Sequence, residues 1–182
     1  NEKEQAQNVR GWVKNTLQVQ ESIMVEPYYN KVKDFGMEFY SDGMGQIDYL
    51  GLSLFHTANG AYTGNILATE EEKKEILSHY ISIDLVENIK VNVQAVLGQL
   101  FRDKYCGPFG IDMMVVASRP QKTGRGPEDI LLHPCVEINL RRTMGHVALC
   151  LSPPEPSPMR VMRICMEGHY KIRVRTQQKG VR

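Results

Sequence analysis

The sequence has no apolar run long enough to cross a membrane, and no signal-like segment opens it. It also lacks a strong charge of either sign, because 22 Lys and Arg residues stand against 21 Asp and Glu residues. Its four cysteines form no CxxC pair. These absences give no reason to propose a membrane partner, a polyanion partner for the whole chain, or a disulfide framework. We therefore expect a soluble, cytoplasmic protein with reduced, mostly buried thiols at Cys106, Cys135, Cys150 and Cys165.

Positive charge gathers at the C-terminal end. Residues 160–182 contain a single acidic residue, Glu167, together with the basic residues Arg160, Arg163, Lys171, Arg173, Arg175, Lys179 and Arg182. Such a segment could contact nucleic acid or acidic lipid. An edge strand protected by charge, followed by a disordered end, explains it more simply, so we do not expect a nucleic-acid partner.

Polar residues alternate with apolar ones in the stretch Val136-Glu137-Ile138-Asn139-Leu140-Arg141. Residues two apart on a strand share a face of the sheet. Glu137, Asn139 and Arg141 would therefore project to one side, while the apolar residues between them face a core. A carboxylate, an amide and a guanidinium on one face are suited to a charged ligand.

An upstream run over 109–116 repeats the arrangement, with Asp112 near the start of an otherwise apolar strand. If the two strands are neighbours, Asp112, Glu137 and Asn139 offer three hard oxygen ligands of the kind that magnesium prefers. The planar fork of Arg141 binds carboxylate or phosphoryl oxygens in pairs. The alternative is the solvated outer face of an antiparallel sheet, and spacing alone does not decide between the two.

The remaining patterns predict an α+β protein with an antiparallel sheet flanked by helices. Helices are predicted over 2–18, after an N-cap at Thr69, over 83–104, and over 143–152 from Thr143. Strand-like runs are predicted at 22–29, 32–40, 46–55, 109–117, 130–140 and about 159–175. Two loops are predicted, one over 119–127 and one over 59–65 that holds Tyr62, Gly64 and Asn65.

Read together, the polar strands resemble the end of the ATP-grasp domain of carboxylate-amine ligases. The resemblance rests on Gly110-Ile111-Asp112-Met113-Met114, on Glu137-Ile138-Asn139-Leu140-Arg141 and on Thr143-Met144-Gly145. In that family an Asp on one strand, and a Glu and an Asn two apart on the next, hold two magnesium ions against the ATP phosphates. The resemblance gives Asp112, Glu137 and Asn139 this role, with manganese as a substitute metal, and implies that Arg141 is a catalytic residue that contacts substrate or the transferring phosphoryl group.

The upstream stretch Ile23-Met24-Val25-Glu26-Pro27-Tyr28-Tyr29 resembles the strand whose backbone pairs with adenine. Glu26 to Tyr28 would then form the hinge between two lobes, and Val25, Glu26 and Tyr28 are candidates for nucleotide binding. Asp34 matches the acid that binds the ribose hydroxyls. Without the resemblance, Val25 and Tyr28 would be interpreted as core residues and Asp34 as a strand-end or turn acid.

The resemblance covers residues 22–146 and implies the C-terminal subdomain, or second lobe, of an ATP-grasp domain. We expect a leading helix over 1–20, the lobe over 21–152, and a Pro-rich linker with a strand or hairpin and a basic tail over 153–182. The family's first lobe supplies a lysine and a glycine-rich loop over the phosphates, and neither has a counterpart before Ser22. The chain would therefore be a fragment of a ligase, inactive in isolation.

The implied reaction transfers the γ-phosphoryl group of ATP to a small-molecule carboxylate, and an amine or similar nucleophile then attacks the acyl phosphate. Two other functions stay open. One is a non-catalytic nucleotide-binding or interaction module, and the other is an unrelated metal-dependent enzyme that uses the same ligands. A homo-oligomer also stays open, and the sequence identifies neither the acid nor the nucleophile.

Overall fold

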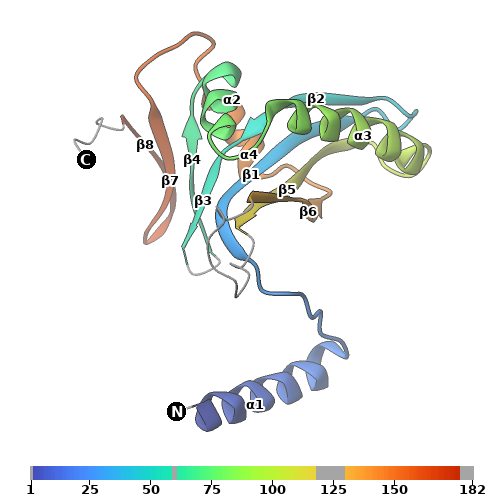
Figure 1. Cartoon of the computed structure of the whole chain (residues 1–182), viewed down its shortest axis with the longest axis vertical. Coiled ribbons are helices and arrows are strands. Elements are labelled where there is room, and N and C mark those ends of the chain that lie inside the picture. The colour runs from blue at the N-terminus through green and yellow to red at the C-terminus, as the bar shows by residue number, and fades with distance from the viewer. Residues whose placement is uncertain (1, 59–60, 118–129, 177–182) are drawn as a thin grey trace, which may run out of the picture.

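The computed structural model describes residues 2–58, 61–117 and 130–176. The predicted loop over 119–127 lies outside these residues, and so does the basic tail from residue 177 onward. Two antiparallel sheets form the body of the molecule, with helices packed on and between them (Figure 1). The α+β class predicted from the sequence is confirmed, although the sequence patterns predicted one sheet and the chain forms two.

Within the described part of the chain, each sheet has four strands. The first sheet, sheet A, has the order β2-β1-β5-β6, with β1 Asn30–Ser41, β2 Ile47–Ser53, β5 Gly107–Ala117 and β6 Ile130–Asn139. The second, sheet B, has the order β3-β4-β7-β8, with β3 Phe55–Ala58, β4 Ala61–Leu67, β7 Arg160–Glu167 and β8 His169–Thr176. Only Leu54 separates β2 from β3, so the chain passes directly from one sheet into the other.

The described residues form four helices, α1 Glu2–Gln20, α2 Glu70–Ser78, α3 Ile83–Phe101 and α4 Met144–Leu151. Helices α2 and α3 cover one face of sheet A. The N-caps predicted at Thr69 and Thr143 are confirmed: each side-chain hydroxyl accepts a hydrogen bond from the backbone three residues on, which satisfies a donor that the first helical turn would otherwise leave free.

The main core lies between sheet A and its two covering helices. Phe35, Met37 and Phe39 alternate along β1 and are fully buried, while the residues between them turn to the opposite face. Phe39 stacks on Phe109 of β5 with ring centroids 5.2 Å apart, and Phe101 of α3 packs edge-on against Phe109 at 5.1 Å. This core fixes which face of sheet A is left for polar residues.

Three sequence-based expectations are wrong. Residues 22–29 form no strand, and the structure describes them as an extended segment without regular hydrogen bonding. Residues 61–67 form strand β4 rather than a loop, because their pairing with β3 and β7 overrides the turn-forming composition. The cysteines are free, as expected, but Cys106, Cys135 and Cys150 are exposed rather than buried.

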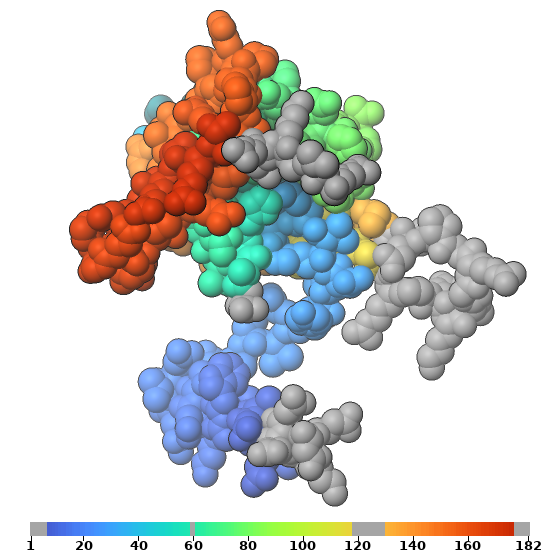
Figure 2. All heavy atoms as spheres, turned by 90° about the vertical axis from the view of Figure 1, so that its left-hand side faces the viewer, coloured from blue at the N-terminus to red at the C-terminus, as the bar shows by residue number. Residues whose placement is uncertain are grey.

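Helix α1 lies apart from the body, joined to it by the segment before β1 (Figures 1 and 2). Its apolar residues Val9, Trp12 and Leu17 are exposed. Among the described helices, none is long and apolar enough to span a membrane.

The aromatic stack in the core generates a stability prediction. Replacing Phe109 by Ala should lower the free energy of unfolding by about 3–5 kcal/mol, because the substitution removes a fully buried ring and leaves a cavity. Tyr170→Ala is the matched control, since this ring is 75% exposed, and it should change stability by no more than about 0.5 kcal/mol. Urea denaturation of both variants measures the difference. Equal losses would mean that the stack does not anchor sheet A.

Candidate functional site

A cleft of about 290 Å³ opens on the face of sheet A opposite the main core, where sheet B and α4 form its other walls. Both sheets and the N-terminus of α4 contribute side chains. The cleft is lined by Glu38, Ser53, Phe55, Thr57, Tyr62, Asn65, Asp112, Glu137, Asn139, Arg141, Thr143, Met144 and Gly145. All four residues that the sequence singled out on the polar strands therefore lie in one cavity.

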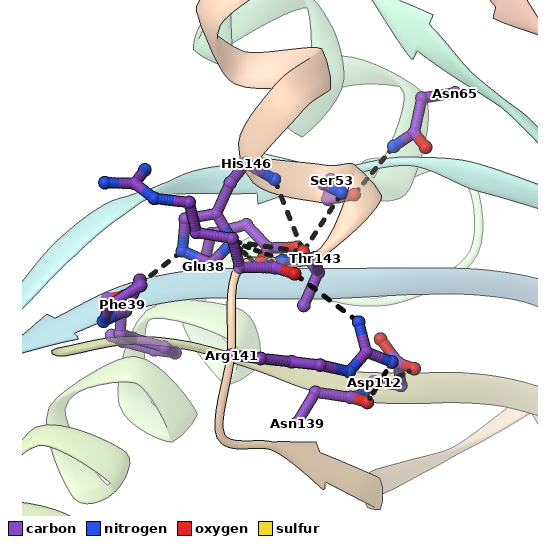
Figure 3. Close-up of polar contacts among 12 residues, drawn as sticks. Glu38, Phe39, Ser53, Asn65, Asp112, Asn139, Arg141, Thr143 and His146 are labelled. Carbon is purple, nitrogen blue, oxygen red and sulfur yellow. Dashed lines mark hydrogen bonds and ion pairs between the residues drawn. The ribbon is translucent and has the colours of Figure 1, made fainter. Parts of the chain in front are cut away.

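Strand pairing brings the acids of β5 and β6 together. Asp112 lies directly opposite Glu137, and Gly110 lies opposite Asn139. Residues directly opposite each other on antiparallel strands have adjacent side chains. Asn139 donates a hydrogen bond from Nδ2 to Asp112 Oδ2 at 3.2 Å, and its Oδ1 accepts one from Arg141 Nη2 at 2.9 Å (Figure 3). Asn139 thus links the carboxylate on β5 to the guanidinium.

A second acid, Glu38 of β1, lies at the floor of the cleft and is 2% exposed. Thr143 donates a hydrogen bond from Oγ1 to Glu38 Oε2 at 2.8 Å. The carboxylate fits there only because two neighbours are glycines: a Cβ at Gly110 or at Gly145 would overlap the Glu38 carboxylate. A side chain at either position would therefore have to displace the Glu38 carboxylate.

His146 joins this buried group from the first turn of α4. Its Nδ1 lies 2.9 Å from Glu38 Oε2 and 3.2 Å from the backbone nitrogen of Thr143. Its Nε2 faces the carbonyl oxygen of Phe39 at 3.3 Å. Because the imidazole is only 4% exposed, these contacts attach the N-terminus of α4 to β1 without competition from water.

Sheet B supplies the opposite wall. Asn65 of β4 is fully buried, donates to Ser53 Oγ at 2.7 Å, and accepts a hydrogen bond from the Tyr62 hydroxyl. At the rim, Thr57 of β3 donates to Asp34 Oδ2 at 2.7 Å. Asp34 also forms an ion pair with Lys31 at 2.6 Å, so this candidate ribose ligand lies beside the cleft and is already held by two partners.

Negative charge dominates the floor of the cleft. Burial is the main cause that raises the pKa of Asp112 to about 6, and the nearby carboxylates of Glu38 and Glu137 raise it further. The hydrogen bond from Asn139 acts in the opposite direction by favouring the ionised form. The folded protein thus disfavours the ionised form of Asp112.

A divalent cation suits this arrangement of donors. Carboxylate and amide oxygens are hard ligands, and a cation beside Asp112 and Glu137 would offset the repulsion that raises the Asp112 pKa. Within the residues that the structure describes, no group of three His, Cys, Asp or Glu side chains is arranged to hold a metal. Any bound cation would therefore depend on Asn139, on water or on ligand oxygens as well.

The structure does not bring every predicted residue to the cleft. Val25 and Tyr28 are 88% and 92% exposed in the segment before β1, and neither they nor Glu26 line the cavity. The interpretation of Val25 and Tyr28 as core residues is also wrong. Sequence reasoning in turn missed Glu38, whose one visible signal is an acid within the apolar run of β1.

No protein-family model matches the sequence, and no curated protein does. Solved structures with a similar arrangement include a protein from Archaeoglobus fulgidus described as a member of the ATP-grasp superfamily, at 16% identity and a TM-score of 0.44. The match covers 82% of this chain and 47% of that one. The N5-carboxyaminoimidazole synthetase of Staphylococcus aureus is similar too. Its complex with ADP matches at 14% identity and a TM-score of 0.42, over 76% of this chain and 36% of the other.

The same synthetase in a structure whose description names no ligand gives a TM-score of 0.41. This chain therefore spans about half or less of the length of the proteins it matches. A structural similarity this weak does not identify a reaction, so the function is inferred from the cleft itself.

The contact between Gly145 and Glu38 generates a prediction about packing. Gly145→Ala should lower the free energy of unfolding by about 1–3 kcal/mol, because the new methyl group would displace either the buried carboxylate or the start of α4. Gly11→Ala is the control, since a Cβ at this helical position meets nothing within 4 Å and should not lower stability. Denaturant unfolding compares the two, and a neutral Gly145→Ala would contradict the close approach.

The acidic floor generates a prediction about charge. Without divalent cations at pH 7, Asp112→Asn should raise the free energy of unfolding by about 1 kcal/mol, a value reduced for the partial exposure of the carboxylate. The native pKa lies above the unfolded one, so the penalty for ionisation is absent below about pH 4 and complete above about pH 6. The gain should accordingly vanish at pH 4.

Chemical denaturation at the two pH values measures this gain, with Asp48→Asn on β2 as an exposed control. A stabilisation of Asp112→Asn that is equal at both pH values would show that the folded protein does not raise the pKa of Asp112.

Proposed function

We propose that this chain is the ATP- and magnesium-binding part of an ATP-grasp ligase, which activates a carboxylate as an acyl phosphate for attack by an amine or similar nucleophile. The observation that carries the proposal is the meeting of Asp112, Glu137, Asn139 and Arg141 in one cleft. These residues come from two strands and the turn that follows, and their spacing matches the pattern that the family uses for magnesium and phosphoryl oxygens.

Each residue has a distinct task in this proposal. Asp112 and Glu137 provide adjacent carboxylates for the cation. The Asn139 amide now directs Nδ2 at Asp112 and Oδ1 at Arg141, so it would turn over to place its oxygen beside the cation. Bound magnesium would neutralise charge on the triphosphate. Arg141 is exposed and, among the described residues, donates to Asn139 and to the carbonyl of Arg142, which leaves further guanidinium donors for a phosphoryl group or a substrate carboxylate.

The buried group at the cleft floor has a positioning role. Glu38 and His146 fix the start of α4, and Thr143 of the same turn lines the cleft. The polar side chains are thereby held by a rigid wall, which lowers the reorganisation needed when charged ligands bind.

The nucleotide's other groups are assigned by resemblance. Asp34 would bind the ribose, because it lies at the rim beside Thr57. Val25, Glu26 and Tyr28 would pair with adenine, which requires the segment before β1 to lie closer to the cleft than it does here. Small-molecule carboxylate and amine substrates are part of the proposal and follow from the reaction class alone.

The proposal is tested on the complete natural protein that contains this chain. Glu137→Ala and Asn139→Ala should each reduce ATP turnover on the order of a hundredfold or more, because each removes an oxygen that would hold the cation. Both side chains lie at the cleft and outside the main core, so circular dichroism should show an intact fold. Release of ADP with a panel of carboxylic acids and amines is the measurement.

Glu75→Ala provides the matched control, since Glu75 is an exposed glutamate on α2, outside the cleft, and its loss should leave turnover unchanged. Undiminished turnover in Glu137→Ala would contradict the metal assignment. Magnesium-dependent ATP binding without ADP release for any acid would favour the non-catalytic nucleotide-binding module.

A further inference from the structure

Arginines gather on the face of sheet B that points away from the cleft. On the two strands that form the β7–β8 hairpin, Arg163 lies directly opposite Arg173, and Cys165 lies opposite Lys171. Residues two apart share this face, so Arg175 joins the same row. Asn65 and its partner Met162 turn the other way, towards the cleft and α4. The hairpin therefore presents a basic face that is separate from the candidate nucleotide site.

The basic face is hollowed rather than flat. A pocket of about 100 Å³ is lined by Arg163, Cys165, Arg173 and Arg175. The neighbouring position on β4 is Gly64, where a side chain would meet Arg163 Cγ at 3.2 Å and overlap the Met162 carbonyl. Glycine at this position leaves room for the Arg163 side chain to lie over the sheet.

Two arginines of this face repel each other across the hairpin. Like charges directly opposite each other on paired strands destabilise a sheet, and Arg163 and Arg173 form such a pair. Glu167 contacts Arg173 and Lys171, at the turn end of the hairpin. The positive charge extends to β3, where burial and the nearby cations Lys33 and Arg163 lower the pKa of His56.

Protection of an edge strand does not account for this charge. Sheet B ends at β8, so arginines on β8 would be enough to discourage pairing with another chain. Arg163 and Cys165 lie on β7, an interior strand between β4 and β8. Figure 2 shows the hairpin in orange and red, extending beyond the body of the molecule, where a ligand can reach it.

We propose that the outer face of the β7–β8 hairpin binds a phosphate group in the pocket formed by Arg163, Arg173 and Arg175. Guanidinium groups present planar, paired donors that match phosphate oxygens, and three of them meet around a space suited to one such group. The phosphate is carried either by a small phosphate monoester or by the backbone of a single-stranded nucleic acid, since both present the same oxygens.

The test uses the whole chain in a buffer without phosphate or divalent cations, with inorganic phosphate as the probe. Nuclear magnetic resonance shifts of the backbone amides of residues 163, 165, 173 and 175 should saturate as phosphate is added. Arg163→Gln and Arg173→Gln should each weaken this binding about tenfold or more, because each removes a charge-assisted donor. Arg10→Gln, on the distant helix α1, is the matched control and should bind as the parent does.

A second measurement separates binding from a structural role. Without phosphate, Arg163→Gln should raise the thermal unfolding temperature, because it relieves the repulsion with Arg173. Added phosphate should stabilise the parent protein and not this variant. A fall in the unfolding temperature of Arg163→Gln, before phosphate is added, would show that the arginine serves the fold and would overturn the proposal.

Two further outcomes would also overturn it. One is that sodium chloride at equal ionic strength causes the same amide shifts as phosphate. The other is that binding is lost in Arg141→Gln but kept in Arg163→Gln, since the phosphate would then lie in the cleft. A short single-stranded DNA without terminal phosphates distinguishes the sources: tighter binding than inorganic phosphate identifies the nucleic-acid backbone, and no binding identifies a phosphate monoester. The readout at the hairpin is independent of ATP turnover.

Discussion

The buried carboxylate of Glu38 is the contact on which the cleft depends. It accepts a hydrogen bond from Thr143, lies against the imidazole of His146, and occupies space left by Gly110 and Gly145. A buried charged or polar group is costly unless its partners are in place, so strand β1 and helix α4 are held in one relative position. The floor and one wall of the cleft are fixed by this single group of residues.

The same contact explains the charge of the site. Glu38 lies near enough to Asp112 to raise its pKa, and Glu137 on the neighbouring strand adds to the effect. Positioning α4 by an acid therefore places a third negative charge beside the carboxylate pair. Arg141 contacts this group from the exposed end of the cleft, by donating to Asn139. A site of this kind is set up to receive positive charge, which is the property that magnesium binding requires.

Sheet B serves two environments because its faces are chemically different. One face carries Asn65 and Met162 towards the cleft and α4, and the other carries Arg163 towards solvent. Alternation along each strand produces this division at no cost in backbone geometry. An acidic cleft and a basic hairpin face are thereby kept on opposite sides of one sheet, where a phosphate held by the arginines would not compete with one held in the cleft.

Features with a short-range signal can be predicted from the sequence alone: the alternation that places Glu137 and Asn139 on one face, the strand containing Asp112, and the N-caps that begin α2 and α4. Which segments pair depends on the tertiary structure. Residues 22–29 have strand-like composition but pair with no strand among the described residues, whereas residues 61–65, predicted as part of a loop, belong to β4 between two partner strands. Glu38 could not be recognised locally, because Thr143 lies 105 residues along the chain. Contacts at that separation depend on the folded arrangement of sheets and helices.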